Sequence, residues 1–453
     1  MTKTPRQWLT SLLLLGSVAL ASCGGTAPAT APTAAPSAAA ATAAAPTTAA
    51  ATAAPTTAAP TTAAATAAPT TAAATAAPTT AAMTDGDYTV GMVYVGTPND
   101  GGWNQAHADA LEYVKAKIPG VKTIFIDKVN PGDRPNVKVE QAIDELVSQG
   151  AKFVITNSAE FADGTYVAAE AHPDVTFLHV SGDGVLTGKA PTNVGNVMGR
   201  MEYGKMISGC AAALTSETGK ISYVGPLIDA ETRRLVNSAY LGAKHCWTTI
   251  KGKPAADLKF KVTWIGFWFN IPGVTLDPTT VANEFINGGS DVLMSGIDTT
   301  EALVEANKAT KAGKKIFAVP YDFKDACSQA PDVCLGVPYF NWGPAYVKAI
   351  EAAKGGTWKA SWDWLGPDPA NINNPDTSAV GFIEGPALSP ENKTKLDGFI
   401  AEIISGKLNL YTGPLNYQDG KPFLAAGEVA DDKKIWYADQ LLEGIEGQSA
   451  PKQ

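Results

Sequence analysis

The stretch Tyr88-Thr-Val-Gly-Met-Val-Tyr-Val-Gly-Thr-Pro-Asn-Asp-Gly-Gly-Trp-Asn-Gln105 opens the part of the chain that is able to build a packed core. Its first eight residues, 88–95, are apolar and β-branched, which is typical of a buried strand. A loop rich in Gly and Asn follows, and a helix is expected from Trp103 to Lys117. This order of strand, loop and helix predicts the first unit of a parallel α/β sheet.

The same alternation continues along the chain and then restarts. Short apolar runs predict strands, and amphipathic stretches between them predict helices that cover both faces of the sheet. In the first half we expect strands at 123–127, 153–157 and 175–180, and a helix at 137–149. In the second half we expect strands at 220–224, 260–266, 291–295 and 315–319, and helices at 232–249, 279–287 and 299–312.

The two halves are alike in the order of their segments. Residues 149–156 match 288–295, and 175–183 match 315–322, weakly in identity. We therefore expect two doubly wound α/β lobes, the first at about 84–200 and the second at about 201–340, with the final segment partly returning to the first lobe. Ligands of such sheets lie beyond the carboxyl ends of the strands, so the cleft is expected between the lobes.

The segment after residue 355 is rich in aromatic residues. Trp358, Trp362 and Trp364 stand among Gly and Pro residues. This composition predicts a tail that packs on the second lobe.

The N-terminal residues 1–22 are typical of a lipoprotein signal peptide. Lys3 and Arg6 precede an apolar run of about 14 residues, which is too short to span the ~30 Å hydrocarbon core as a helix. The run ends in Leu20-Ala-Ser-Cys-Gly24, which resembles a bacterial lipoprotein box with Cys23 as the lipidated residue. We therefore expect attachment to the outer face of the cell membrane. An ordinary signal peptide or a short anchor is the alternative.

Residues 23–83 predict a tether between this anchor and a binding domain at 84–453. Residues 26–82 contain only Ala, Thr, Pro and the single Ser37, so they cannot build a core. Fully extended at ~3.1 Å per residue, the tract reaches on the order of 180 Å. A passive spacer through a surface layer explains the composition equally well.

Charge and cysteine content limit the possible partners. The net charge of −9 argues against nucleic acid, whose binding requires Lys and Arg to displace counterions. Besides Cys23 the chain has an even number of cysteines, which in an exported protein predicts disulfides. Three pairings are possible, and the spacing favours Cys327–Cys334 with Cys210–Cys246. No C-x-x-C motif occurs and no His lies in zinc-ligand register with these residues, so we expect no metal.

Polar and aromatic side chains recur at the ends of the predicted strands. Rings that stack on the faces of a ligand, with amides and carboxylates at its edge, suit a small, flat and polar molecule. The candidates are Asp100, Trp103, Asn104, Asn157, Asp183, Trp268, Phe269, Asp298, Asp322, Asn341 and Trp342. The alternative for any one of the aromatic residues is an ordinary place in a core or at a lobe interface.

The motif Asn99-Asp-Gly-Gly-Trp-Asn-Gln105, after the apolar strand, resembles the opening motif of the basic membrane protein family. The members are lipoproteins similar to the purine nucleoside receptors of bacterial ABC importers. Segments 264–277, 295–302, 320–322 and 334–344 resemble one branch of this family. The resemblance covers about residues 88–355.

This resemblance implies a type I periplasmic-binding-protein fold, a purine nucleoside or nucleobase as ligand and an ABC permease as partner. In the family an aromatic ring from each lobe sandwiches the base. Trp103 matches the ring of the first lobe, and either Trp268 or Phe269 supplies the second. Asn104 matches a polar contact, and Asp322 matches an acidic position after a strand of the second lobe.

The sequence departs from the family pattern at two places. Many members have an Asp a few residues before the Asn-Asp pair, where this chain has Tyr94-Val95. Many also have a Lys, associated with the sugar hydroxyls, in the segment that matches 338–342, and this chain has none there. A free nucleobase or another planar heterocycle is therefore an alternative to a nucleoside.

Two other functions are compatible with the same residues. A sensor that presents its closed form to a membrane kinase would use the same closure. Asp183 and Asp322 would be the acid and base of a nucleoside hydrolase, but the chain lacks the usual catalytic motifs. We therefore expect a monomeric binding protein with no enzyme activity and no cofactor.

Overall fold

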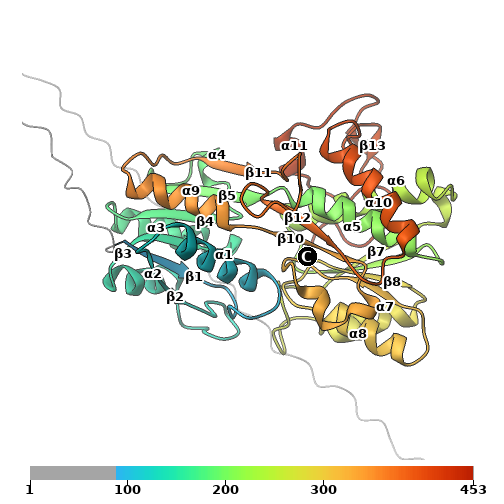
Figure 1. Ribbon diagram of the computed structural model, residues 1–453, viewed down its shortest axis with the longest axis horizontal. Coiled ribbons are helices and arrows are strands. Elements are labelled where there is room, and N and C mark those ends of the chain that lie inside the picture. The colour runs from blue at the N-terminus through green and yellow to red at the C-terminus, as the bar shows by residue number, and fades with distance from the viewer. Residues whose placement is uncertain (1–87, 452–453) are drawn as a thin grey trace, which may run out of the picture. The chain divides into compact units, whose positions relative to one another are not determined.

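The computed structural model of the chain describes residues 88–451. The expected signal peptide, Cys23 and nearly all of the tether lie outside the described residues. Within residues 88–451 the chain forms two α/β lobes, each built on its own parallel sheet (Figure 1). No helix in this part of the chain is long and apolar enough to span a membrane.

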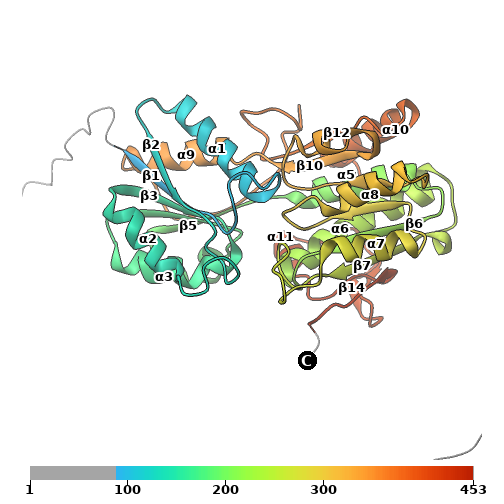
Figure 2. The same ribbon diagram turned by 90° about the horizontal axis from the view of Figure 1, so that it is seen from below.

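The first lobe contains a six-stranded sheet in the order β11-β5-β4-β3-β1-β2, in which all neighbours are parallel. Its strands are β1 (Thr89–Val93), β2 (Lys122–Ile126), β3 (Ala151–Thr156), β4 (Thr176–Val180), β5 (Val194–Gly199) and β11 (Trp362–Leu365). Its helices are α1 (Trp103–Lys117), α2 (Val139–Ser148), α3 (Ala162–Ala171), α4 (Gly184–Thr187) and α9 (Gly343–Lys354). Helices α1 and α9 pack together on one face, and α2 and α3 pack together on the other (Figure 2).

The second lobe contains a five-stranded parallel sheet in the order β15-β7-β6-β8-β9. Its strands are β6 (Lys220–Gly225), β7 (Lys259–Trp264), β8 (Val292–Ser295), β9 (Phe317–Val319) and β15 (Ile445–Glu446). Its helices are α5 (Met201–Thr215), α6 (Ala230–His245), α7 (Pro278–Asn287), α8 (Glu301–Lys311) and α10 (Pro390–Ile404). Two apolar clusters cover the two faces, one with α5, α6 and α10 and the other with α7 and α8. The sheet is therefore doubly wound.

Helices α5 and α6 approach each other unusually closely. A Cβ on Gly209 would lie 1.9 Å from the backbone oxygen of Ala239, and one on Gly242 would lie 2.0 Å from that of Met206. Real side chains are not found at such distances, so only Gly fits at either place. The two glycines thus fix the spacing of the helices behind the second sheet.

The chain passes between the lobes three times. It crosses from β5 to α5, from β10 (Gly336–Phe340) to α9, and from β11 to β12 (Val380–Glu384). Strands β10 and β12 pair antiparallel as a two-stranded ribbon (Figure 1). These three crossing segments together form the hinge between the lobes.

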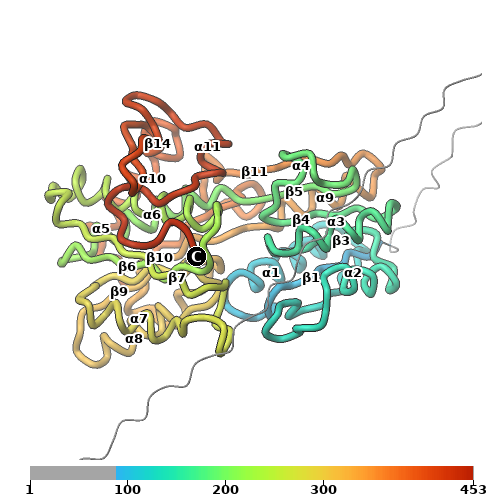
Figure 3. The backbone as a smooth tube through the Cα atoms, turned by 180° about the vertical axis from the view of Figure 1, so that it is seen from behind, coloured from blue at the N-terminus to red at the C-terminus, as the bar shows by residue number. Residues whose placement is uncertain are grey.

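The C-terminal segment lies on the second lobe, on the side of α6 (Figure 3). It contains β13 (Leu415–Asn416), β14 (Pro422–Leu424), α11 (Asp432–Trp436) and β15. Asn237 of α6 holds it, since the side-chain amide donates to the carbonyl of Gln440 at 3.0 Å and accepts from the backbone N–H of Leu442 at 2.9 Å.

The fold class expected from the sequence is confirmed, because each half is a parallel sheet covered by helices on both faces. The expected strands and helices exist, with ends that differ by a few residues. Strand β5 and helix α5 were not foreseen. Helix α5 has the sequence MEYGKMISGCAAALT, in which small residues weaken the contrast between an apolar and a polar face.

The expectation that the tryptophans after residue 355 pack on the second lobe is wrong for all three, since Trp358 also lies against β5 of the first lobe, where a Cβ on Gly195 would be 3.1 Å from its ring. Trp362 and Trp364 lie in β11, which pairs with β5 as the edge strand of the first sheet. Both rings belong to the core of the first lobe. The edge of β5 needs a partner strand, and this requirement is not visible in a single run of residues.

Cys210 is bonded to Cys246, and Cys327 is bonded to Cys334, which is the pairing that the spacing favoured. The first bond joins α5 to the turn after α6. The second closes a short loop that precedes β10.

We expect the Cys210–Cys246 bond to contribute more to stability. It closes a sequence separation of 36 residues against 7 for the other bond, which corresponds to about 4 and about 2.5 kcal/mol of lost chain entropy in the unfolded state. The measurement is denaturant unfolding of the double variants Cys210→Ala/Cys246→Ala and Cys327→Ala/Cys334→Ala. A larger loss of stability in the second double variant would contradict this.

Candidate ligand pocket

One pocket takes residues from the strand ends of both lobes. The first lobe contributes Val95, Trp103, Asn157, Ser158, Ala159 and Ser181. The second lobe contributes Glu231, Trp268, Asp298 and Tyr321. These residues follow β1, β3, β4, β6, β7, β8 and β9, so the pocket lies where ligands of doubly wound sheets bind.

The pocket is narrow. It contains about 310 Å³ of space free of protein atoms, but the centre of a water-sized sphere can reach only about 10 Å³ of this space. That is room for about one water molecule. A flat ring therefore enters only after the two lobes have moved apart.

Three residues at this edge of the sheets have a left-handed backbone conformation that residues other than Gly rarely adopt. They are Lys128 after β2, Ser181 after β4 and Asp322 after β9, with φ of 56°, 66° and 72°. No other non-Gly residue among residues 88–451 has a positive φ. Such conformations cost of order 1–3 kcal/mol each and cluster at functional sites.

Trp103 forms the aromatic wall of the first lobe. It is the first residue of α1, and its indole N–H donates to the carbonyl of Asn157 at 2.6 Å. The rings of His107, Phe340 and Trp342 meet it edge to face at 4.6, 5.3 and 5.5 Å. These contacts fix the orientation of the indole, so it is a rigid surface.

Two rings of the second lobe line the same pocket. Trp268 follows β7, and its indole N–H donates to Glu160 in the first lobe at 2.8 Å. Tyr321 follows β9 and was not among the candidates from the sequence. Trp103 of the first lobe and Trp268 of the second lobe therefore line one pocket, and Trp103 also packs against the apolar core of its own lobe.

The wall formed by the second lobe is acidic and buried. Burial raises the pKa of Asp298 and of Asp322 well above the usual range, and the other carboxylates nearby raise it further. Lys205 and the Tyr321 hydroxyl oppose the shift at Asp322. Neither oxygen of Asp322 has a well-formed hydrogen bond within residues 88–451, and nor does Oδ2 of Asp298. Of the two residues, Asp298 lines the pocket, whereas Asp322 is fully buried behind it.

The cation nearest to this wall is itself held by protein groups. The ammonium of Lys205 donates to the carbonyl of Ser295 at 2.7 Å and lies 3.2 Å from the centroid of the Tyr321 ring. Burial lowers the pKa of Lys205, and the charge of Asp322 opposes that shift.

Glu231 is a further acidic group that the sequence did not single out. It lies in the first turn of α6, which begins after the N-cap Asp229. Burial raises the pKa of Glu231 to about 7, and the neighbouring Arg234 opposes the shift. Ser181 of the first lobe donates to its carboxylate across the cleft. The capping signal at Asp229 could have revealed the helix start, but nothing in the sequence shows that this turn faces the pocket.

An outer pocket adjoins this site and collects other candidates. Phe269, Asp100 and Asn104 line it together with Lys128 and Glu301. Asp100 accepts from the backbone N–H groups of Gly102, Asn104 and Gln105, so it caps the start of α1. Of the two aromatic candidates after β7, Trp268 thus lies in the inner pocket and Phe269 in the outer one.

Four candidates line neither pocket. Asp322 is one of them and is fully buried after β9. Asp183 accepts from the hydroxyl of Tyr437 at 2.7 Å. Asn341 donates to the carbonyls of Pro375 and Ser378 at 3.0 and 2.7 Å. The Trp342 ring is 2% exposed and stacks on His107 and Phe340 at 4.8 and 4.6 Å. Asn341 and Trp342 follow β10, as the sequence indicates. This strand leads from the second lobe to the first, so the two residues lie in the hinge and not at the cleft.

The lobes approach each other closely at Gly102. A Cβ at this position would lie 1.8 Å from the backbone oxygen of Asp298. Gly102 therefore permits the closed arrangement of the lobes.

No group of three or more His, Cys, Asp or Glu residues in the range 88–451 is arranged to hold a metal ion. The pocket itself is lined by the rings of Trp103, Trp268 and Tyr321 and by the carboxyls of Asp298 and Glu231.

Comparison with known proteins identifies relatives over most of the chain. The family model described as ABC transporter substrate-binding protein PnrA-like matches residues 88–408. A purine-binding protein of Brucella abortus is 31% identical over 359 residues, which cover 79% of this chain and 92% of that protein. A putative ABC transporter glucose-binding protein of Haloferax volcanii is 24% identical over 359 residues, which cover 79% of this chain and 80% of that protein.

A solved structure supports the same fold. An ABC transporter solute-binding protein of Aeropyrum pernix superimposes with a TM-score of 0.57 at 14% identity, covering 73% of this chain and 93% of that one. At this identity the similarity concerns the fold alone.

We expect Gly102→Ala to hold the lobes apart while both stay folded. The new methyl group requires a shift of about 1.6 Å to restore the 3.4 Å of ordinary contact with the Asp298 oxygen. Spin labels on the exposed Glu145 of α2 and Glu284 of α7 should report a longer mean distance in this variant than in the parent protein.

The matched control is Gly398→Ala in α10, where a Cβ meets nothing within 4 Å. It should leave the distance unchanged and slightly raise the stability, because Ala favours a helix over Gly by up to about 1 kcal/mol. Equal distances in the Gly102 variant and the control would show that the close approach does not limit closure.

Proposed function

The chain belongs to the PnrA-like family of ABC transporter substrate-binding proteins, and we propose that it captures a purine base or nucleoside between Trp103 and Trp268 for delivery to an ABC permease. The observation that carries this proposal is that both rings, one from each lobe, line one narrow pocket together with the buried carboxyls of Asp298 and Glu231. The purine-binding relative from Brucella abortus supports the same class of ligand.

The carboxylates favour a ligand with N–H groups on its rim. Asp298 and Glu231 line the pocket, and Asp322 is buried beside Tyr321. The amino and ring N–H groups of a purine are donors, and a donor placed against one of these carboxyls favours its ionised form, which only accepts hydrogen bonds. A heterocycle of this kind would satisfy Oδ2 of Asp298, which has no hydrogen-bond partner within residues 88–451.

The energy available from these contacts matches micromolar binding. A dissociation constant of 1 μM corresponds to about 8 kcal/mol. Stacking on an aromatic side chain contributes about 1–3 kcal/mol per base, and a hydrogen bond to a charged group about 1.5–3 kcal/mol. Two rings and two or three such hydrogen bonds reach this value before the cost of ordering the lobes.

Closure of the lobes is the proposed mechanical step. The ligand enters when the lobes are apart, and the three crossings act as the hinge. The closed form then carries contacts that span the cleft, such as Trp268 to Glu160 and Ser181 to Glu231. We propose that the permease recognises this form, with the protein held at the outer membrane surface by a lipid on Cys23 and the tether of residues 23–83.

A sugar is the second candidate for the ligand. The relative from Haloferax volcanii is described as a putative glucose-binding protein. The outer pocket, lined by Thr97, Asn270 and Glu301, offers the polar groups that hydroxyls need. A nucleoside would combine the two, with its base in the inner pocket and its sugar in the outer one.

We expect a purine to raise the unfolding temperature of the protein. A ligand at 100 times its dissociation constant adds about 2.7 kcal/mol to the free energy of unfolding. A thermal-shift panel of adenine, guanine, hypoxanthine, adenosine, guanosine, inosine and glucose tests this. A shift with glucose and none with any purine would replace the purine proposal by a sugar.

We expect Trp103→Ala to weaken binding of the best purine by at least about tenfold. Loss of one stacking face removes about 1–3 kcal/mol, and tenfold corresponds to about 1.4 kcal/mol. Isothermal titration gives the affinity, and Trp103→Phe is the control because it keeps an aromatic face. If the Ala variant is folded by circular dichroism and binds as the parent does, Trp103 is not a stacking residue.

A further inference from the structure

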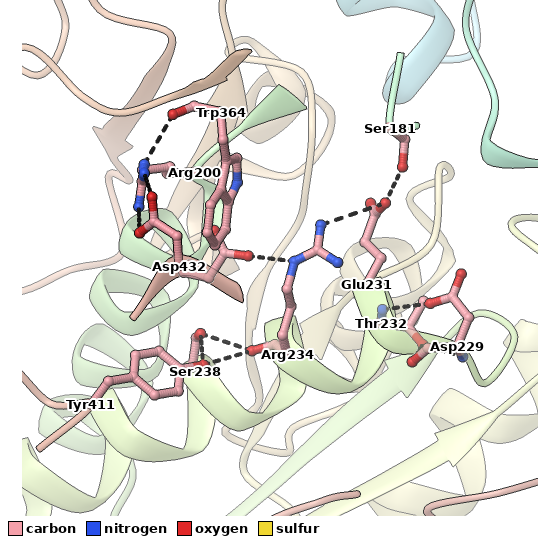
Figure 4. Close-up of polar contacts among 11 residues, drawn as sticks. Ser181, Arg200, Asp229, Glu231, Thr232, Arg234, Ser238, Trp364, Tyr411 and Asp432 are labelled. Atoms are coloured by element: carbon pink, nitrogen blue, oxygen red, sulfur yellow. Dashed lines mark hydrogen bonds and ion pairs between the residues drawn. The ribbon is translucent and has the colours of Figure 1, made fainter. Parts of the chain in front are cut away.

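A buried ionic chain connects the pocket with the hinge and the C-terminal segment (Figure 4). Arg234 of α6 donates from Nε to Glu202 of α5 at 2.7 Å, and its Nη2 lies 3.8 Å from Glu231. The side chains of these three residues are 2%, 5% and 7% exposed. Glu231 is the member of the chain that lines the pocket.

Arg234 is also enclosed by aromatic rings. Its guanidinium carbon lies 4.1 Å from the ring centroid of Trp436 in α11 and 5.8 Å from that of Trp364 in β11. The two rings meet edge to face at 5.1 Å. An arginine loses less by leaving water when its planar face contacts such rings and its edge meets carboxylates.

The surroundings of Arg234 are themselves fixed from both lobes. Arg200, at the crossing from β5 to α5, stacks on Trp364 at 4.3 Å and forms two hydrogen bonds with Asp432 at 2.8 and 2.5 Å. Tyr411 donates to the backbone carbonyl of Arg234 at 3.1 Å. The residues that close around Arg234 therefore come from the hinge and from the last part of the chain.

We propose that Glu231 is a ligand-reading carboxylate of the pocket and that Arg234 is the positioning residue that holds it there in its charged form. This inference deepens the proposed function and rests on it for the identity of the ligand. Glu202 and the indoles of Trp364 and Trp436 enclose Arg234, which does not line the pocket. It therefore acts on the ligand through Glu231. The C-terminal segment thereby contributes to binding without lining the pocket.

The charged groups that face Glu231 set the direction of its pH response. Arg234 lowers its pKa, as does the hydrogen bond from Ser181, whereas Asp229 and Glu202 raise it. Glu231 in turn raises the pKa of Asp298, Asp322, Tyr223 and Tyr321 across the pocket. A ligand that donates to Glu231 favours its ionised form, so binding should weaken as the pH falls through about 7.

The first arm of the test measures purine affinity from pH 6 to pH 8 in the parent protein and in Glu231→Gln. This substitution keeps the shape of the side chain and removes the charge. We expect at least a tenfold loss of affinity at pH 8 and a flatter pH dependence in the variant. Affinity and pH dependence equal to those of the parent would overturn the ligand-reading role of Glu231.

The second arm needs no ligand and follows the titration of the Glu231 side-chain carboxyl by carbon NMR. Removal of an opposite charge nearby shifts a carboxyl by about 1–3 pH units, so Arg234→Met should raise the midpoint by this amount. Glu202→Gln should lower the midpoint, because it removes a negative charge that raises the pKa of Glu231 and leaves Glu231 as the carboxylate that faces Arg234. Lys244→Met removes a positive charge from the same helix about 20 Å away and should leave it unchanged.

The two arms separate the possible failures. If the parent binds no purine, the proposed ligand is wrong, whereas the titration still decides the role of Arg234. If Arg234→Met does not fold, the midpoint in Arg234→Gln decides it, because this variant also removes the positive charge. A midpoint that stays constant in every folded variant would overturn the positioning role.

Discussion

Carboxylates removed from water are the constraint on which the pocket and much of its surroundings depend. Burying an ionised carboxylate costs several kcal/mol unless a cation or donors are near. Asp298, Asp322 and Glu231 are all buried, and a buried cation favours the charged form of two of them, Lys205 at Asp322 and Arg234 at Glu231. Those cations are costly to bury in turn, which explains why aromatic faces enclose both of them. The buried carboxyls at the edge of the second sheet thus require buried cations, and these cations require the rings and the carbonyl that contact them.

The general form of the molecule follows from the sequence, since a parallel sheet leaves a strong local signal. The runs at 88–95 and 220–224 are apolar on both faces, and the amphipathic stretches between such runs have helical length. The strand ends also follow, because carboxyl ends of parallel strands share one edge. Trp103, Asn157, Trp268 and Asp298 were selected on this ground, and the structure brings them into one pocket.

What the sequence does not reveal is which strand ends cross between lobes and which helices turn toward the cleft. Asn341 and Trp342 end a strand, but that strand belongs to the hinge ribbon, so they pack away from the pocket. Glu231 and Tyr321 line the pocket because of the three-dimensional course of the chain, which has no local signal in the sequence. Trp364 and Trp436 are far apart in sequence and meet on Arg234, which is a tertiary contact without a local pattern.

The last strand of the second lobe has a consequence for association between molecules. Strand β15 is only Ile445–Glu446, yet it pairs with β7 and covers the edge that this longer strand would otherwise present. An uncovered edge offers free backbone donors and acceptors to a neighbouring chain, and charged residues such as Lys259 and Lys261 discourage but do not prevent such pairing. Loss of the residues from Ile445 onward would therefore leave the edge of β7 free to pair with another chain, which favours aggregation although the pocket lies elsewhere.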